Sequence, residues 1–414
     1  MTIQTEWTAA APAVVSAKPR SGYVNPEAIA TGAWLGVLGG GQLGRMWVHA
    51  AQSHGFRAAV LEPDANSPAG AAADHHWPAN YTDPIALAAM LRQCAAVTTE
   101  FENVPALALR QLANGGIVVT PSAEAVEVCQ HRALEKQCFA RAGVACAPYV
   151  LIQTVADVER AASLDLLPGI LKTARLGYDG KGQARVQTLA ELTAAWHAFE
   201  AVPCVFERRL DLLCEVSVIV ARTSDGHCVN LPVQQNLHRD GILAVTQVPA
   251  PDISDAVAAR AIAHAQRLAE ELHYVGVLCV EFFVLMDGTL VANEMAPRPH
   301  NSGHWSLDGC DVSQFDLQLR VMVGWPLVNP RQHSAAVMLN LLGDVWLGAP
   351  GGSAGPVEPA WAAVLALPGV HLHLYGKQQA RPGRKMGHIT VTAPTLDAAR
   401  TQAERVSHCL GLPW

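Results

Sequence analysis

Three glycines, a lysine and an acid share the seven residues GYDGKGQ at positions 177 to 183. The segment just before them, PGILKTARL, is strand-like and carries Lys172 at the end of its apolar run. Glycines let a backbone approach an anion and let a loop move, and Lys181 adds a point charge. The stretch lacks the Walker pattern G-x-x-x-x-G-K-[ST]. We interpret it as a lid over nucleotide phosphates, with a solvated hairpin turn as the alternative.

A hairpin is expected in VLCVEFFVLMDGTLVANEM, where two strand-like runs flank Asp287 and Gly288. Asp-Gly is a preferred two-residue hairpin turn. Outside such a turn Met286 pairs with Thr289. Continuing this ladder brings residue 281, a glutamate, opposite residue 294, also a glutamate. The hairpin therefore predicts two carboxylates that face each other.

Facing carboxylates repel each other unless a cation lies between them. A short array of hard oxygen ligands that also meets phosphate oxygens suits Mg²⁺, with Mn²⁺ as an alternative. Glu281 and Glu294 would be the ligands, and Asn301 just beyond the hairpin could add an oxygen. The other interpretation, two solvated glutamates on an edge hairpin, is disfavoured by the apolar neighbours in CVEFFV and VANEM.

The turn GGGQLG, Gly39 to Gly44, follows a strand-like run and opens a helical one, and Glu62 ends the next strand. This is the arrangement of a dinucleotide-binding turn, in which amides hold a pyrophosphate and the acid binds a ribose. Any tight turn from strand to helix needs glycine, however, and any helix N-terminus attracts anions. A nicotinamide-dependent oxidoreductase and a purely structural turn both stay open on this motif alone.

A basic turn, KQQARPGRKMGH, gathers Lys377, Arg381, Arg384 and Lys385 near a Pro-Gly pair. Guanidinium groups bind phosphate in a bidentate way, although a basic turn is more often a solvated face. Among the seventeen histidines, His238 lies in a polar loop-like stretch, QQNLHRDG. No nucleophilic Ser/His/Asp or Cys/His set can be assembled from the sequence.

The composition is that of an ordinary globular protein: 414 residues, half of them hydrophobic, suffice for two or three domains. A net charge of −7 provides no global attraction for nucleic acid or an anionic membrane. The ten cysteines form no metal-type cluster, so we interpret them as small buried hydrophobes in a reducing cytosol. No positively charged segment opens the sequence, so we expect no signal peptide, and no apolar run approaches membrane length. We therefore expect a cytoplasmic protein.

The elements that must position these groups follow from the apolar pattern. Strand-like runs alternate with helical ones from residue 34 to 124, which predicts a parallel, doubly wound sheet. One helix is expected over 124–143. Strands with two helical interruptions, near 188–200 and 254–272, indicate an α+β domain over 125–328. Three strands and a terminal helix form a small domain over 329–414, and residues 1–33 are expected to be a disordered tail.

Together these motifs resemble one family, the N5-carboxyaminoimidazole ribonucleotide synthetases. GGGQLGRM, HRALEKQ, GYDGKGQ, NLHRDGI, NEMAPRPHNSGHW and HLYGKQQARPGRKMGH occur in that family's order and spacing over about residues 34–412. The resemblance implies an ATP-grasp fold: a Rossmann-like domain, a central ATP-grasp domain and a small β-rich domain. It also implies a homodimer with no nucleic-acid or membrane partner.

The implied activity belongs to purine biosynthesis. ATP converts bicarbonate to carboxyphosphate, whose carboxyl group passes to the amine of 5-aminoimidazole ribonucleotide, with ADP and phosphate as products. A related ligase, the formate-dependent glycinamide ribonucleotide transformylase, is the nearest alternative. It carries Glu where Gln42 stands and Asp where Asn301 stands, so both positions favour the carboxylating enzyme.

The resemblance also assigns residues, which fall into three groups. ATP is contacted by Arg132, Lys172, Gly177, Tyr178, Asp179, Gly180, Lys181, Gly182, Gln183, His238, Asn293 and Glu294, with an adenine hinge of Glu207, Arg208, Arg209 and Leu210 and with Glu215 on the ribose. The ribonucleotide is contacted by Gln42, Leu43, Glu100, Asn301, Lys377, Arg384 and Lys385. The groups closest to the chemistry are Lys172, Lys181, His238 and Asn301, and the magnesium ligands are Glu281 and Glu294.

Overall fold

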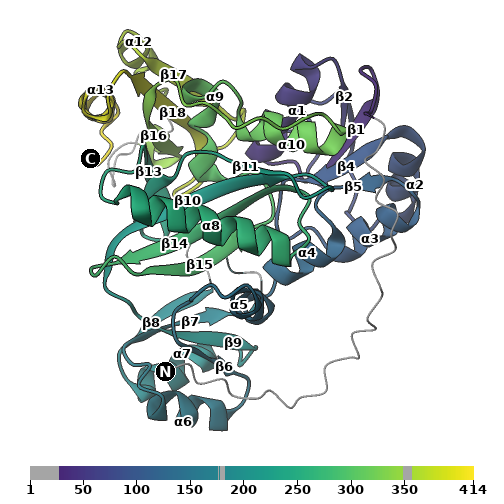
Figure 1. Cartoon of the computed structure of the whole chain (residues 1–414). Coiled ribbons are helices and arrows are strands. Elements are labelled where there is room, and N and C mark those ends of the chain that lie inside the picture. The colour runs from purple at the N-terminus through teal and green to yellow at the C-terminus, as the bar shows by residue number, and fades with distance from the viewer. Residues whose placement is uncertain (1–27, 176, 178–181, 348–356) are drawn as a thin grey trace.

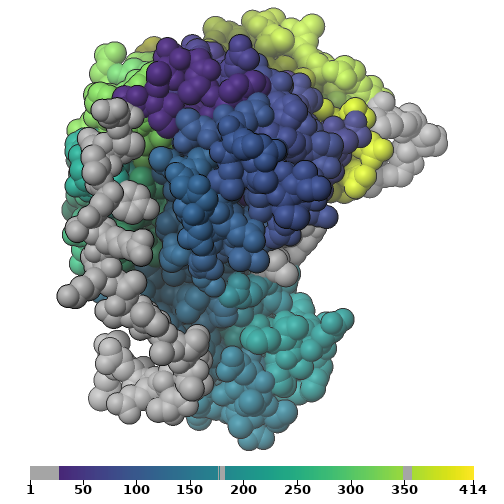
Figure 2. Space-filling view, turned by 90° about the vertical axis from the view of Figure 1, so that its right-hand side faces the viewer, coloured from purple at the N-terminus to yellow at the C-terminus, as the bar shows by residue number. Residues whose placement is uncertain are grey.

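The computed structural model describes residues 28–175, 177, 182–347 and 357–414. Three sheets organise this part of the chain (Figure 1). A parallel sheet lies at the upper right, a large sheet crosses the middle, and a small sheet forms the lower end. In Figure 2 the unit that contains the small sheet, residues 149–208, projects below the N-terminal domain.

The N-terminal sheet is parallel, with the order β3-β2-β1-β4-β5, which confirms the predicted doubly wound domain. Leu35 and Val37 pack on the side of α1, whereas Leu38 packs on the side of α2 and α3. Both faces are covered, which explains why these strands are almost continuously apolar. The elements are β1 (Trp34–Leu38), α1 (Gln42–Ser53), β2 (Arg57–Leu61), β3 (His75–Trp77), α2 (Pro84–Gln93), β4 (Ala96–Thr99), α3 (Ala106–Asn114) and β5 (Val118–Val119).

The folded chain begins before the predicted boundary at residue 34. The amide of Ile29 donates to the carbonyl of Val323 at 2.9 Å, and its side chain packs against the core below α1. The amide of Gly32 donates to the carbonyl of Gly55 at 2.8 Å. Residues 28–33 are therefore part of the N-terminal domain and not of the expected tail, whose other residues, 1–27, lie outside the described chain.

The single helix expected over 124–143 is two helices, α4 (Ala123–Cys129) and α5 (Arg132–Arg141). His131 has an extended backbone and caps α5, because its ring accepts a hydrogen bond from the amide of Ala133. Gln130 donates from its side chain to two carbonyls of the N-terminal domain, those of Glu102 and Val104. The apolar period continues across this break, so periodicity alone did not reveal it.

The small sheet is antiparallel with the order β6-β9-β7-β8, and α6 and α7 cover one face. Only α7 was predicted; α6 was missed, as was α10 (Gln314–Val323) further along. Both missed helices start with a capping box, Thr154 with Asp157 and Ser313 with Asp316, a signal readable from sequence. The elements are β6 (Tyr149–Ile152), α6 (Val155–Ser163), β7 (Gly169–Thr173), β8 (Gln183–Val186), α7 (Leu189–Ala198) and β9 (Cys204–Arg208).

The large sheet has the order β15-β14-β10-β12-β13-β16-β18-β17, with β11 paired to β10. Strand β13 pairs directly with β16, so the predicted C-terminal domain continues the central sheet and does not form its own. The strands are β10 (Leu212–Arg222), β11 (Cys228–Asn230), β12 (Gln234–Arg239), β13 (Ile242–Val248), β14 (Gly276–Leu285), β15 (Leu290–Ala296), β16 (Ala335–Leu342), β17 (Val370–Leu374) and β18 (Lys385–Ala393).

Helices cover both faces of this sheet. Even-numbered residues of β10 and β14, such as Val218 and Val280, pack against α8, and odd-numbered ones, such as Ile219 and Cys279, pack toward α10. This alternation has a period of two, as expected of strands, and turns odd-numbered residues toward the functional site. The remaining helices are α8 (Asp255–Glu271), η1 (Asn301–Gly303), α9 (Ser306–Gly309), α11 (Asp344–Leu347), α12 (Trp361–Leu365) and α13 (Leu396–Leu410).

All ten cysteines lie in the described chain, and none forms a disulfide. Five are buried, as expected of small hydrophobes, whereas Cys409 is exposed on α13. None of the helices in the described part of the chain combines the length and the apolar character that a membrane crossing requires.

Candidate active site

Two adjoining cavities lie where the three sheets meet. Their volumes are about 780 Å³ and about 430 Å³. Five residues line both of them: Arg132, Glu294, His300, Asn301 and Lys385. These five come from a helix, a hairpin, the segment after it and the C-terminal strand β18, so the boundary between the cavities draws on distant parts of the chain.

The smaller cavity lies between the small sheet and the large one. Most of the residues predicted to contact ATP line it: Arg132, Lys172, Gln183, Glu207, Arg208, Arg209, Leu210, Glu215, His238, Asn293 and Glu294. Gly177 lines the larger cavity instead, and Gly182 lines neither of the two. Tyr178, Asp179, Gly180 and Lys181 lie outside the described residues.

A buried carboxylate between two lysines forms one wall of the smaller cavity. The two oxygens of Glu207 lie 2.8 Å from Nζ of Lys172 and 2.9 Å from Nζ of Lys136. Burial alone would raise the pKa of Glu207, but the two ammonium groups outweigh it and lower that pKa to about 2. The ion pair with Glu207 thereby holds Lys172 in place at the cavity, where it can meet a phosphate.

His238 pairs with Glu215 on the neighbouring strand, Nδ1 to carboxylate oxygen at 2.8 Å. Burial would lower the pKa of His238, but the Glu215 carboxylate and the more distant Glu281 raise it to about 9. The imidazolium therefore supplies a second positive charge to the cavity near neutral pH.

Glu281 and Glu294 are directly opposite each other on β14 and β15, as predicted, but the turn and the strand pairing between them differ from the prediction. The turn has three residues, 286–288, with the amide of Leu285 bonded to the carbonyl of Thr289 and Gly288 at φ 79°. The predicted pairing of Met286 with Thr289 is thus wrong by one residue.

A β-bulge at Asn293 restores the register. Ala292 and Met295 both pack on the α8 side, so Asn293 and Glu294 between them both turn toward the cavity. Asn293 lies with its Oδ1 3.5 Å from Nζ of Lys172. The bulge therefore adds an amide to the carboxylate pair, which a regular hairpin would not do.

The carboxylate pair and its surroundings fit a hard divalent cation. Burial, and next the facing Glu294, raise the pKa of Glu281 above its ordinary value, even though Arg132 lies 3.2 Å from Glu294. Asn301 is buried, and neither of its amide atoms has a hydrogen-bond partner within the described chain. Oxygen ligands of this kind suit Mg²⁺.

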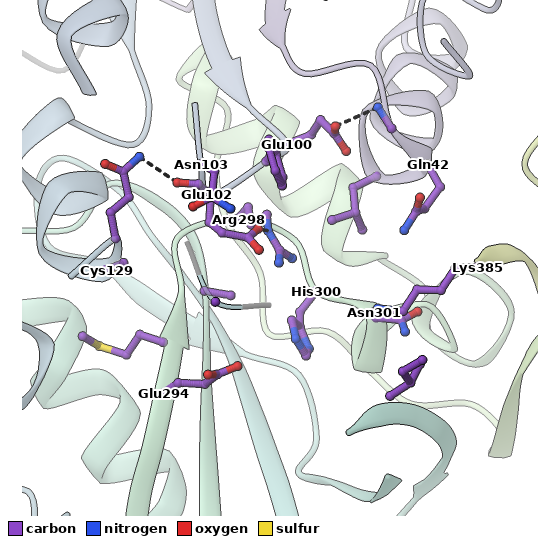
Figure 3. Close-up of a pocket in the computed structure, with 18 of the residues that line it drawn as sticks. Gln42, Glu100, Glu102, Asn103, Cys129, Glu294, Arg298, His300, Asn301 and Lys385 are labelled. Atoms are coloured by element: carbon purple, nitrogen blue, oxygen red, sulfur yellow. Dashed lines mark hydrogen bonds and ion pairs between the residues drawn. The ribbon is translucent and has the colours of Figure 1, made fainter. Parts of the chain in front are cut away.

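The larger cavity contains all seven residues predicted to contact the ribonucleotide. Figure 3 shows Gln42 and Lys385 on one side of it and Glu294 on another, with His300 and Asn301 between them. Nζ of Lys377 lies 2.9 Å from Oε1 of Gln42 and 2.6 Å from the carbonyl of Lys385, which ties the C-terminal segment to the first helix.

Glu100 occupies the position that a pyrophosphate would need. Its two carboxylate oxygens accept hydrogen bonds from the amides of Gly41 and Gly44, at 2.7 and 3.0 Å, at the start of α1 (Figure 3). The amide of Gly40 donates to Glu62 at 2.9 Å. Carboxylates of the protein thus satisfy the amides of the glycine turn, which argues against the nicotinamide-dependent oxidoreductase.

Three residues of this region were given no role from the sequence. Arg298, whose side chain is 14% exposed, pairs with Glu102 from the N-terminal domain. The side chain of His300 is mostly but not fully buried, and desolvation, with Arg298 nearby, lowers its pKa well below the ordinary value. Arg298 and His300 belong to the APRPHN segment, which carried part of the family resemblance. That motif was the sequence signal that could have identified them.

A second group of potential metal ligands, Asp308, His373 and His388, lies apart from these cavities. The rings of His373 and His388 are stacked, with centroids 4.5 Å apart and an angle of 12° between their planes. A metal ion lies in the ring plane of each imidazole that binds it, and two stacked planes share no such point. The His373–Asp308 contact at 2.8 Å is sufficient to explain the group as a packed polar cluster.

Comparisons with known proteins agree with this arrangement. Family models match residues 33–130 (ribonucleotide synthetase preATP-grasp domain), 137–315 (ATP-grasp domain) and 336–402 (phosphoribosylaminoimidazole carboxylase C-terminal domain). The N5-carboxyaminoimidazole ribonucleotide synthase of Brucella melitensis biotype 1 is 44% identical over 366 residues, 88% of this chain and 97% of that protein. The chain belongs to the N5-carboxyaminoimidazole ribonucleotide synthase family. The predicted resemblance and fold class are therefore confirmed.

Other members of this synthase family match equally broadly. The synthase of Bacillus subtilis strain 168 is 37% identical, over 89% of this chain and 93% of that protein. A synthetase solved as its ADP complex matches with a TM-score of 0.85 at 36% identity, over 93% of this chain and 98% of that one. The Aspergillus clavatus synthase, solved with ADP and 5-aminoimidazole ribonucleotide, matches with a TM-score of 0.82 at 31% identity, over 92% and 99%.

Proposed function

We propose that this protein carboxylates 5-aminoimidazole ribonucleotide at the expense of ATP, giving N5-carboxyaminoimidazole ribonucleotide in purine biosynthesis. The observation that carries the proposal is the shared boundary of the two cavities, where Arg132, Glu294 and Asn301 face both. A nucleotide in the smaller cavity and a ribonucleotide in the larger one would direct their reacting ends to this boundary. Relatives with the same domain order support the substrate choice.

The chemistry then takes place in two steps. A bicarbonate oxygen forms a bond to the γ-phosphorus of ATP, and the bond from that phosphorus to the β-phosphate oxygen breaks with its electron pair leaving on ADP. The exocyclic amine next attacks the carboxyl carbon, phosphate leaves with the electron pair of the broken C–O bond, and the nitrogen loses a proton. Such transfers require alignment and charge neutralisation more than a nucleophilic side chain.

The residues of this chain supply that neutralisation. Lys172, Arg132 and the His238 imidazolium provide positive charge along the smaller cavity, and Lys181 would add to it from the glycine loop. Glu281 and Glu294 would hold Mg²⁺, with Asn301 beside them, and the bound ion would supply Lewis-acid polarisation of phosphate oxygens. Carboxyphosphate hydrolyses readily in water, so closure of GYDGKGQ over the site would protect it.

The ribonucleotide phosphate would lie against Lys377, Arg384 and Lys385, with Gln42, Leu43 and Glu100 toward its other end. We further propose a cytoplasmic homodimer, which the family resemblance implies. Sedimentation of the purified chain tests the dimer: a single species of one chain's mass would contradict it.

The first experiment measures ADP release from MgATP in bicarbonate buffer, with and without 5-aminoimidazole ribonucleotide. A parallel arm supplies formate and glycinamide ribonucleotide. We expect strong stimulation by the imidazole substrate alone. Stimulation only in the formate arm would keep the ATP-grasp fold and overturn the substrate, and no stimulation in either arm would contradict the proposed activity.

A further inference from the structure

A buried polar network lies beneath the boundary of the two cavities. Its members are Ser217 on β10, Gln234 and Asn236 on β12, Thr246 on β13 and Ser302 in η1. All five side chains are buried in an otherwise apolar part of the sheet. Polar groups in such places lose hydration, so the hydrogen bonds that they make to one another strongly determine their arrangement.

The network ends at the ring of His300. Nδ1 of His300 lies 2.8 Å from Oγ of Ser302 and 3.3 Å from the backbone nitrogen of Ser302. A backbone N–H can only donate, so Nδ1 accepts and carries no proton. The neutral ring must then hold its proton on Nε2.

The other hydrogen bonds are consistent with this direction. Ser302 donates its hydroxyl proton to His300, so its oxygen accepts from Ser217 at 2.8 Å and from Gln234 at 3.2 Å. Ser217 in turn accepts from Nδ2 of Asn236 at 2.8 Å, and Oδ1 of Asn236 accepts from Thr246 at 3.0 Å. Each of these hydroxyl groups donates its single proton once.

The opposite edge of the ring faces the site. Nε2 of His300 lies 3.4 Å from Oε1 of Glu281, and the residue lines both cavities. Turning the ring by half a revolution would remove both contacts with Ser302. The network therefore fixes the tautomer of His300 as well as its orientation.

We propose that Ser302 is a positioning residue: with Ser217, Gln234 and Asn236 it holds His300 as a neutral Nε2–H donor aimed at the boundary where the substrates meet. In this state His300 donates a hydrogen bond to an oxyanion, such as a carboxylate or phosphate oxygen, and does not accept a proton at Nε2. The target of that hydrogen bond rests on the proposed function, whereas the tautomer does not.

The tautomer is tested by ¹⁵N NMR on the full-length chain labelled at histidine, without substrates. The His300 signals are those missing from His300→Gln. We expect a protonated Nε2 and an unprotonated Nδ1 in the wild type. In Ser302→Ala the two nitrogen shifts should move part of the way toward each other, because only the longer contact with the backbone N–H of residue 302 then favours this tautomer. A proton on Nδ1 in the wild type, or an unchanged spectrum in Ser302→Ala, would overturn the proposal whatever the enzyme's activity is.

Turnover provides the second readout. Ser302→Ala should lower kcat by about 10-fold or more while leaving the KM for ATP unchanged, and Ser302→Thr, which keeps the hydroxyl, should recover most of it. Ser407→Ala is the control, because this serine is also buried but lies on α13 and makes no side-chain hydrogen bond within the described chain. An equal loss of kcat in Ser407→Ala would reduce the role of Ser302 to general stability.

Discussion

At the scale of residues, the site depends on charges that are buried in matched sets. Glu207 lies between Lys136 and Lys172, both of which are themselves largely buried. The carboxylate pairs with two ammonium groups, and this attraction offsets the free energy that each ammonium loses when it is removed from water. Glu294 pairs with Arg132 at 3.2 Å, but one guanidinium neutralises only one of the two facing carboxylates, which is why Glu281 and Glu294, and not Glu207, fit a metal ion.

Glu207→Gln should destabilise the protein by about 3–5 kcal/mol at neutral pH, because it leaves two buried lysines unpaired. Folding lowers the pKa of Glu207, so its contribution is fully present above the ordinary pKa and is lost as pH falls toward about 2. The difference between variant and wild type in urea unfolding should therefore shrink at about pH 3. Glu404→Gln on the exposed side of α13 is the control; a loss of the same size there would contradict the argument.

Glu294→Gln should reduce magnesium-dependent ADP release at least about 100-fold, equivalent to about 2.7 kcal/mol, because the amide cannot replace an anionic ligand. The side chain is 42% exposed, so the fold should be preserved. Magnesium titrations of turnover, with circular dichroism as the check on folding, measure the effect. Turnover at the wild-type level would remove Glu294 from the proposed metal site.

Lys377→Ala should raise the KM for the ribonucleotide about 10-fold to 100-fold and change the KM for ATP much less, because the ammonium lines only the larger cavity. Separate titrations of the two substrates measure the ratio. Arg405→Ala on α13, remote from both cavities, serves as the control. Equal increases for both substrates in Lys377→Ala would argue against the phosphate pocket.

At the scale of elements, the β14–β15 hairpin shows how a local irregularity sets chemistry. The three-residue turn displaces the register by one residue, and the bulge at Asn293 compensates, so Glu281 still faces Glu294. The bulge also turns Asn293 toward Lys172. In a hairpin of this length, either irregularity alone would shift Glu281 and Glu294 out of direct opposition.

Two single-residue deletions separate these contributions. Deleting Met286, which is exposed, should convert the turn to a two-residue Asp-Gly turn and keep KM and kcat within about 2-fold of wild type. Deleting Asn293 should also keep Glu294 opposite Glu281, because Glu294 then follows Ala292 directly and Ala292 pairs with Phe282. It removes the amide beside Lys172, and the KM for ATP should rise about 10-fold, equivalent to about 1.4 kcal/mol.

Steady-state kinetics and thermal unfolding of the two deletion variants provide the measurement. Each variant is the control for the other, because both shorten the same hairpin by one residue. Loss of activity in the Met286 deletion with full activity in the Asn293 deletion would contradict the assignment of the bulge.

At the scale of the whole molecule, the site exists because three segments remote in sequence converge. Lys377 meets Gln42, Arg298 meets Glu102, and Gln318 of α10 donates to Thr98 of the N-terminal sheet at 2.6 Å. The C-terminal strands continue the central sheet through β13 and β16. The predicted boundary at residue 328 therefore does not separate two structurally independent domains.

A fragment of residues 329–414 should consequently not fold alone. Without β13, the strand β16 would expose one edge of backbone groups, and its residues Ala336 and Met338, which pack against the central domain, would face water. We expect association or disorder in size-exclusion chromatography and no cooperative transition by circular dichroism, in contrast to the full chain. A monomeric fragment with a sharp thermal transition would contradict this expectation.

The sequence by itself determined the family, the parallel and antiparallel patterns, and the facing glutamates, because these depend on local periodicity and on motifs that survive without tertiary contacts. Only the tertiary structure decided the break before α5, the bulge at Asn293, the pairing of Lys136 with Glu207 and the network beneath His300. Each of these depends on partners distant in sequence, and burial makes an unsatisfied polar or charged group costly enough for such partners to decide the local conformation.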